Sequence, residues 1–243
     1  MKVLIIGDSH TRRLSAGLRS LQDEEAVDDG LRIKVQGLGT GRLLATPFFR
    51  PMDGYAEVVE PEFREYMERI PPEPGVYHAI GLSMLFHPSR IMRSILRGGY
   101  CVGEFIPGRQ AISESLFREL SRQDQTYVLQ LCDLLKAAGY RVFAVSAPGT
   151  FRDYPLVSEL GAAQALRIER LHRSEVLHQL ERRGIEAVDI PTACRDADGF
   201  MKQEFRAERA DDAHHGNAAF GKLMMQHVLE LLRSPPPGVA TRE

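Results

Sequence analysis

The chain has 243 residues, 43% of them hydrophobic and 26% charged, which is long enough for one α/β domain with a full core. Its formal charge of −2, with acids and bases mixed along the chain, argues against a nucleic-acid partner and favours a small or neutral substrate. The cysteines Cys101, Cys132 and Cys194 lack the paired spacing of a zinc site or a redox pair, which is typical of small apolar residues in a reduced cytoplasm.

The chain begins with the apolar run 1–6, which ends at Gly7-Asp8-Ser9. That run is too short for the apolar region of a signal peptide and lacks a small-residue cleavage site, so it predicts a strand. No stretch approaches the roughly 18 to 20 apolar residues that span a bilayer. We therefore expect a cytoplasmic protein with no membrane partner.

Short β-branched and apolar runs that end at Gly or Pro predict five strands. They cover Val3–Ile6, Leu31–Gln36, Val76–Gly81, Tyr140–Ser146 and Ile185–Ile190. Apolar residues at helical spacing predict helices between and after them. These helices follow Ser9, cover Ser113–Ala138 and Leu160–Arg183, and include the face from Phe220 to Leu231.

Strands that alternate with helices indicate βαβ units. We therefore predict an α/β fold, a three-layer α/β/α sandwich with a mainly parallel five-stranded sheet, in a single domain over 1–233. In such sheets ligands gather at the carboxyl ends of the strands.

Two stretches do not follow this alternation of strands and helices, at about 46–75 and 85–110. They are expected to be irregular connections, either lids and binding loops or surface insertions without a role. The tail 234–243 contains three consecutive prolines and is predicted to be disordered.

The motif Gly7-Asp8-Ser9-His10 stands at the end of the first predicted strand. Ser9 would open the following helix, where free backbone N–H groups and the helix dipole favour an oxyanion. The alternative is that Ser9 is only an N-cap.

The second constellation is the segment 211–217, just before the last helix. A serine hydroxyl needs a base, usually an imidazole oriented by a carboxylate, and Asp212 and His215 would supply both. Capping of the helix is the competing explanation. A metal site is not expected, because two adjacent histidines do not easily face one ion and no further Cys or His lies at ligand spacing.

Gly7-Asp8-Ser9 and Asp212-x-x-His215-x-Asn217 together resemble the first and last sequence blocks of the SGNH (GDSL-like) hydrolases. The resemblance implies a flavodoxin-like sandwich and ester hydrolysis or acyl transfer, with no metal or organic cofactor. It implies Ser9 as nucleophile, His215 as base and Asp212 as the group that orients it. A rival register pairs Asp211 with His214.

The resemblance also implies an oxyanion hole, built from the Ser9 N–H, a glycine after the second strand and an asparagine after the third. Gly39 and Gly41 both fit the glycine, and the Thr40-Gly41 step favours Gly41. Ser83 stands in place of the asparagine, so either Ser83 or a residue of the next loop such as His87 replaces the donor, or the enzyme is slow, or catalysis has been lost.

Other polar residues accompany the two motifs. Asp8 and His10 flank Ser9 and are grouped with the substrate-side residues, although a surface turn is the alternative for His10. His227 is expected to pack in the core. Arg12 and Arg13 would either contact an anionic substrate or be solvated on the helix surface.

The leading hypothesis is a serine esterase that acts on a small-molecule or glycan acyl ester, with an acyltransferase using the same residues as its variant. A nucleotide-binding domain using Gly37-x-Gly39-x-Gly41 is the alternative from another class, but Arg42 occupies the position where its fingerprint needs glycine. A non-catalytic glycan- or partner-binding descendant is a third. The sequence predicts no oligomeric state.

Overall fold

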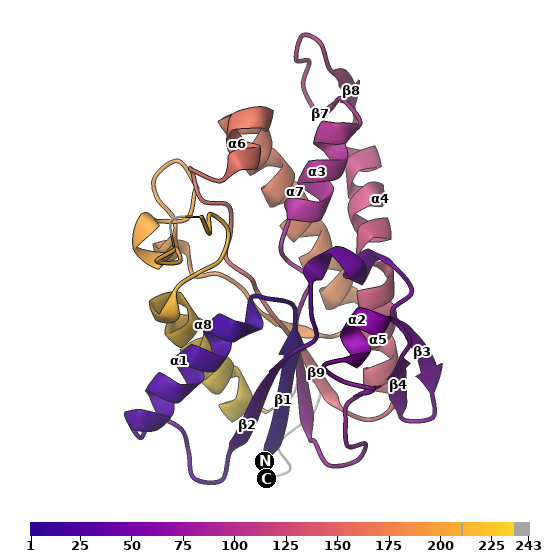
Figure 1. Ribbon diagram of the computed structural model, residues 1–243, viewed down its shortest axis with the longest axis vertical. Helices are drawn as coiled ribbons and strands as arrows, with labels where there is room; N and C mark the ends of the chain where they lie inside the picture. Colours follow the sequence, from indigo (N-terminus) through magenta and orange to yellow (C-terminus); the bar gives the residue numbers. More distant parts are fainter. Residues whose placement is uncertain (210, 236–243) are drawn as a thin grey trace.

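The core of the protein is a five-stranded sheet in which all neighbouring strands run parallel, in the order β10-β9-β6-β1-β2. Figure 1 labels β1, β2 and β9 of this sheet. The computed structural model describes residues 1–209 and 211–235, so the predicted tail lies outside the described residues from 236 onward. The strands are β1 (Lys2–Gly7), β2 (Arg32–Gly37), β6 (Ala79–Ser83), β9 (Arg141–Val145) and β10 (Glu186–Val188). The predicted three-layer α/β architecture with a parallel five-stranded sheet is confirmed.

Helices cover both faces of the sheet because successive side chains of each strand point to opposite sides. Val3 and Ile5 of β1 pack against α1 (Thr11–Asp23) and α8 (Ala218–Arg233). Leu4 and Ile6 pack in the opposite layer, whose helices include α5 (Thr126–Ala137) and α7 (Ala162–Arg182). No described helix is long and apolar enough to cross a membrane.

The third core strand begins and ends later than predicted, at Ala79 and Ser83 instead of Val76 and Gly81. Its extent is set by pairing with β1, where Ala79 lies opposite Val3 and Ser83 opposite Gly7. A pairing register between distant segments leaves no mark in a local apolar pattern. As a result, Ser83 is the last residue of the strand instead of a loop residue.

Two predicted helices are each divided in the structure. The segment 113–138 forms α4 (Glu114–Asp124) and α5, which meet at Gln125. In the segment 160–183, Leu160 is the last residue of α6 (Pro155–Leu160), and Gly161 separates α6 from α7. Gly161 has φ +87°, a left-handed conformation that a continuous helix cannot contain.

The two stretches expected to be irregular contain regular structure, which corrects that prediction. Ala56 and Val58 alternate into the core from an antiparallel sheet of order β3-β4-β5, and such short strands are hard to recognise in sequence. The remaining elements are η1 (Gly41–Ala45), β3 (Phe49–Met52), β4 (Tyr55–Val58), α2 (Pro61–Arg64), β5 (Arg69–Ile70), α3 (Ser89–Arg97), β7 (Tyr100–Val102), β8 (Gln110–Ile112), η2 (Thr192–Cys194) and η3 (Gln203–Phe205). The assignment of 1–233 to one domain stays a prediction.

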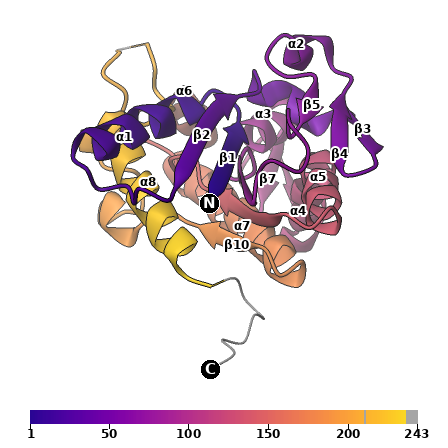
Figure 2. The same ribbon diagram turned by 90° about the horizontal axis from the view of Figure 1, so that it is seen from below.

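The helices α1 and α8 lie side by side (Figure 2), and two glycines let their backbones come into contact. A Cβ on Gly17 would lie 2.2 Å from the carbonyl carbon of Gly221, and a Cβ on Gly221 would lie 1.9 Å from the Arg13 carbonyl oxygen. Only glycine permits this approach. Because Ser9 precedes α1 and His215 precedes α8, the close packing of the two helices brings these residues together.

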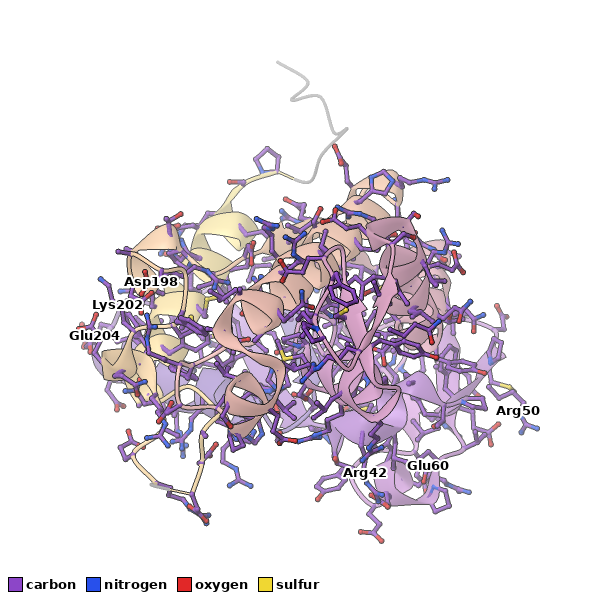
Figure 3. The ribbon with its side chains drawn as sticks, turned by 90° about the horizontal axis from the view of Figure 1, so that it is seen from above. Arg42, Arg50, Glu60, Asp198, Lys202 and Glu204 are labelled. Atoms are coloured by element: carbon purple, nitrogen blue, oxygen red, sulfur yellow. The ribbon has the colours of Figure 1, made fainter. Side chains whose placement is uncertain are left out.

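The loops around this point flank the carboxyl edge of the sheet. Figure 3, seen from above, shows Arg42, Arg50 and Glu60 of the segment after β2 on one side of the molecule. Asp198 and Lys202, from the long connection before α8, lie on the opposite side. Ser9 comes two residues after the end of β1 and therefore lies at the edge where ligands of parallel α/β sheets bind.

Candidate active site

Ser9 stands in a tight turn between β1 and α1. The Asp8 side chain accepts a hydrogen bond from the His10 backbone N–H at 3.0 Å, and the Asp8 carbonyl accepts one from the Thr11 hydroxyl at 2.7 Å. These bonds fix the turn and leave Ser9 exposed. The helix begins at Thr11 with His10 at its N-cap position, so Ser9 neither opens nor caps α1.

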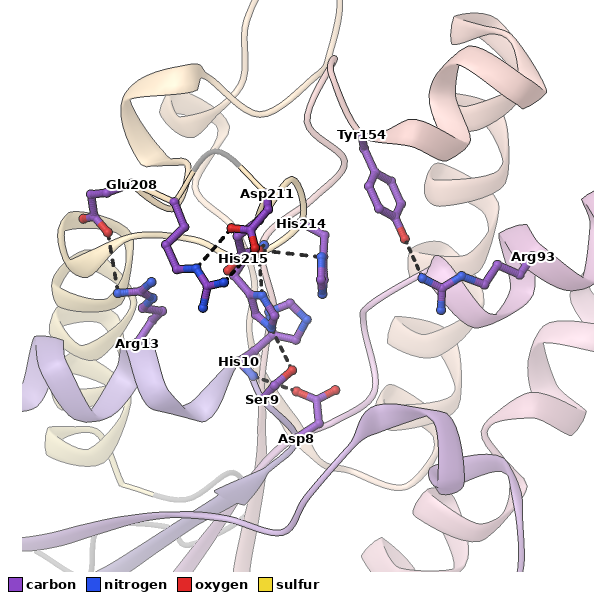
Figure 4. Close-up of polar contacts among 12 residues, drawn as sticks. Asp8, Ser9, His10, Arg13, Arg93, Tyr154, Glu208, Asp211, His214 and His215 are labelled. Atoms are coloured by element: carbon purple, nitrogen blue, oxygen red, sulfur yellow. Dashed lines mark hydrogen bonds and ion pairs between the residues drawn. The ribbon is translucent and has the colours of Figure 1, made fainter.

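His215 contacts both Ser9 and Asp212, and Figure 4 shows its ring above Ser9. Its Nε2 lies 2.7 Å from the Ser9 Oγ, and its Nδ1 lies 2.8 Å from Asp212 Oδ1. The same carboxylate oxygen accepts the His215 backbone N–H at 3.1 Å, which fixes the ring relative to its own backbone. The structure thus brings together the three residues that the sequence singled out.

Capping does not explain the motif, because Asn217 performs that task for α8. Its side-chain oxygen accepts the Phe220 N–H at 3.0 Å, and its amide donates to the Glu204 carbonyl at 2.7 Å. Asp212 and His215 are therefore not needed to satisfy the start of the helix.

The rival register is not assembled. Asp211 pairs with Arg209 at 2.7 Å, and His214 approaches Asp212, with 3.7 Å between His214 Nδ1 and Asp212 Oδ1. Burial opposes the ionisation of Asp212, but hydrogen bonding and charge from His215 outweigh it and lower the pKa of Asp212 below its usual range. Asp212 is therefore ionised at neutral pH.

Four histidine rings surround this point. The His10 ring lies 4.5 Å from the rings of His215 and His87, and the His214 ring lies 4.0 Å from that of His215. His10 is 4% exposed, so the interpretation of it as a surface turn residue is wrong. Burial, with neighbouring histidines, lowers the pKa of His10 and of His87 well below the usual range, so both rings are neutral.

Asp8 is the buried carboxylate of the site. It is 6% exposed, and a Cβ on Gly41 would lie 2.8 Å from its Oδ2. Burial raises the pKa of Asp8 to about 6, although the His10 N–H and the positive charge of Arg90 oppose the rise. At neutral pH the ionised Asp8 carboxylate is therefore buried at a cost to the stability of the folded protein.

We predict that Asp8→Asn stabilises the protein increasingly as pH rises from 4 to above 6. In that window the folded carboxyl, with a pKa of about 6, holds a proton that the unfolded carboxyl, with an ordinary value of 3.8, has released. Wild-type stability therefore falls with rising pH, and the full difference corresponds to about 3 kcal/mol. Urea unfolding of both proteins at pH 4, 5, 6 and 7.5 measures it; a constant difference would contradict the raised pKa.

A groove of about 490 Å³ opens beside Ser9, between the start of α1 and the end of β2. Gly39, with φ +131°, lines the groove together with Ser9. Within the part of the chain that the structure describes, neither the Ser9 nor the Gly39 N–H donates a hydrogen bond. Gly41, favoured in the sequence, instead lies against the Asp8 carboxylate, and its carbonyl accepts a bond from Arg90.

Ser83 lies apart from this groove. Its side chain lines a very small cavity with His10 and Phe220, on the α1 and α8 side of the sheet. It is 1% exposed, and its hydroxyl has no hydrogen-bond partner among the described residues. His87, in the loop after β6, also has two buried ring nitrogens without a described partner.

Asp212, His214 and His215 are the described residues whose ligand atoms could meet at one metal ion, since those atoms lie within 4.8 Å of one another. This corrects the expectation that two adjacent histidines do not easily face one ion, because both Nδ1 atoms approach the same Asp212 oxygen. The expectation that no metal is used stays a prediction.

Sequence reasoning missed the groups that support the site. Arg90 pairs with Asp124 through two bonds of 3.0 and 2.8 Å and donates to the Gly41 carbonyl, so it ties α3 and α4 to the loop after β2. Nothing in the local sequence distinguishes it from other arginines. His227 was assigned to the core, but its side chain is 38% exposed and contacts Glu230.

No family model matches the chain, and no curated protein matches it. Solved structures do: an extracellular lipase from Streptomyces rimosus, at TM-score 0.53 and 11% identity over 96% of this chain and 100% of that one, and an acetyl xylan esterase, at 0.53 and 10% over 96% and 100%. A protein assigned to the G-D-S-L lipolytic family from Desulfitobacterium hafniense matches at 0.52 and 12% over 95% and 98%. At these identities the likeness shows the fold: the chain has the fold of the SGNH hydrolases.

The structure does not favour the nucleotide-binding alternative. A dinucleotide fingerprint needs its glycine-rich turn to open an α-helix whose N-terminus holds the pyrophosphate. The segment 37–41 instead leads into η1, a five-residue 3-10 helix.

Proposed function

We propose that this protein is a serine ester hydrolase with Ser9 as nucleophile, His215 as general base and Asp212 as the group that orients it. The observation that carries the proposal is the continuous pair of contacts from Ser9 Oγ through His215 to Asp212, at 2.7 and 2.8 Å. The lipase and esterase structures of the same fold support ester chemistry in particular.

The geometry provides the proton transfers that ester hydrolysis needs. Asp212 accepts a hydrogen bond from the Nδ1–H of His215, which keeps the proton on Nδ1 and leaves Nε2 as the acceptor for the Ser9 hydroxyl. Ser9 attacks the acyl carbon while Nε2 takes its proton, and Nε2 then protonates the departing alcohol. Water attacks the acyl-Ser9 ester by the same route and releases the acid, whereas an acceptor alcohol in place of water would make the reaction an acyl transfer.

The developing oxyanion requires donors that are in place before the reaction. The N–H groups of Ser9 and Gly39 supply two in this proposal, since both residues line one groove and neither N–H is engaged by the described chain. For the third we assign His87 over Ser83. The Ser83 hydroxyl is buried at a separate, very small cavity, whereas the His87 ring lies against His10 and His214.

We predict that His87→Ala lowers kcat by about 10²-fold, the usual cost of one oxyanion donor, while Ser83→Ala leaves kcat near that of wild type. His87→Asn is the matched control, because its amide restores an N–H donor and should recover part of the lost rate. Steady-state kinetics on p-nitrophenyl acetate measure all three. A larger loss in Ser83→Ala than in His87→Ala would reverse the assignment.

The direct test of the proposed function is turnover of p-nitrophenyl acetate and butyrate by the purified protein. Saturable hydrolysis that disappears in Ser9→Ala supports it. An absence of turnover on these and on acetylated glycans would favour the non-catalytic binding alternative.

A further inference from the structure

The groove beside Ser9 continues along α1, away from the histidine rings. Arg12, Ser15 and Arg19 line it from this helix. They are separated by three and four residues, so they share one face, and Arg12 and Arg19 are about 10 Å apart along the helix axis. The opposite wall comes from Thr40 and Tyr66. A substrate bound at Ser9 would pass both arginines.

Neither of these arginines has a partner in the described chain. The side chains of Arg12 and Arg19 are exposed and make no hydrogen bond or ion pair with any described residue. Two nearby arginines do have acidic partners. Arg13, on another face of α1, forms an ion pair with Glu208 at 3.7 Å (Figure 4), and Arg42 forms one with Glu62. Two unpaired guanidinium groups on one wall make the groove positively charged.

The carboxylate that lines the groove pairs with neither arginine. Asp8 is the acidic residue among those lining it, and it is 6% exposed with one oxygen committed to the His10 N–H. Ser15, Thr40 and Tyr66, which carry hydroxyl groups, also line the groove. Guanidinium groups beside hydroxyls are the donors that bind carboxylates and phosphates.

We infer that the substrate is an anionic ester, whose carboxylate or phosphate group binds to Arg12 and Arg19 while its acyl carbon lies at Ser9. The inference rests on the proposed function, because it places the ester at Ser9. The two arginines are specificity residues, since they contact a part of the substrate that does not react. Their contribution appears mainly in KM.

The test compares esters that differ only in charge. Mono-p-nitrophenyl adipate and its phosphono analogue are measured against p-nitrophenyl hexanoate, which places the anion on the acyl side. A second arm measures acetate release from an O-acetylated glucuronoside and an acetylated sugar phosphate against the acetylated glucoside, which places the anion on the alcohol side. The pairs also distinguish carboxylate from phosphate.

We expect wild type to prefer at least one anionic ester by about tenfold or more in kcat/KM, as two charge-assisted contacts would give. Arg12→Gln and Arg19→Gln should each reduce this preference about threefold, and the double variant should remove it. Arg12→Lys should retain part of it. Arg97→Gln, an exposed arginine of α3 outside the groove, is the control and should retain all of it. Added salt should weaken the preference.

Two results would overturn the inference. One is a wild type that hydrolyses the neutral esters but prefers no anionic ester in either arm. The other is a preference that survives in the double glutamine variant. Both are distinct from failure of the proposed function, in which no ester, neutral or anionic, is hydrolysed.

Discussion

Ser9→Ala is expected to lower kcat by about 10⁴-fold or more on any ester that the wild type hydrolyses, because no other group can form the acyl intermediate. The fold should be unaffected. Ser9 is exposed, and its hydroxyl bonds to His215 alone in the described chain, so the free energy of unfolding should change by less than about 0.5 kcal/mol. Turnover and urea unfolding of the same samples test both statements.

Ser20→Ala provides the matched control, since Ser20 is another α1 serine, whose hydroxyl contacts Glu24 outside the groove. It should retain wild-type turnover. If Ser9→Ala kept a substantial part of the activity, Ser9 would be a turn residue beside the site, and the nucleophile would have to be sought elsewhere.

The second large effect is expected at His215, where replacement by alanine should also lower kcat by about 10⁴-fold or more. Without its Nε2, the Ser9 hydroxyl has no acceptor for its proton. His214→Ala should cost about tenfold or less, because His214 touches the His215 ring at 4.0 Å but does not contact Ser9. Kinetics of the two variants, with His227→Ala as a distant control on α8, provide the comparison.

An equal loss in the two histidine variants would contradict the assigned register. It would mean that the pair acts together, either through shared protons or through a common ligand at Asp212. A greater loss at His214 would restore the rival register, which the structure does not assemble.

The sheet was predictable because its signal is local. The three central strands, β1, β6 and β9, are short, mostly apolar runs, and burial on both faces makes such runs continuous. The end of β6 was not predictable, because it depends on pairing with β1, which lies about 75 residues away in the chain and places Gly7 opposite Ser83. The position of Ser83 relative to the site therefore could not be read from its place after an apolar run.

The candidate site was predictable where the spacing of residues along the chain defines it. Asp212 and His215 are three residues apart, which lets one carboxylate oxygen contact both the backbone and the ring of His215. The burial of His10 was not predictable, since it arises from rings contributed by distant loops. The absence of a described partner for Arg12 was also not predictable, because a sequence does not show which arginines form ion pairs with carboxylates in the fold.

The measurement that tests the central claim most directly is fluorophosphonate labelling, with mass spectrometry to locate the adduct. A serine activated by His215 should react as a nucleophile, whereas an ordinary hydroxyl should not. The account predicts one adduct, on Ser9, that is absent in Ser9→Ala and much slower to form in His215→Ala. An unlabelled wild type, or equal labelling of wild type and Ser9→Ala, would contradict it.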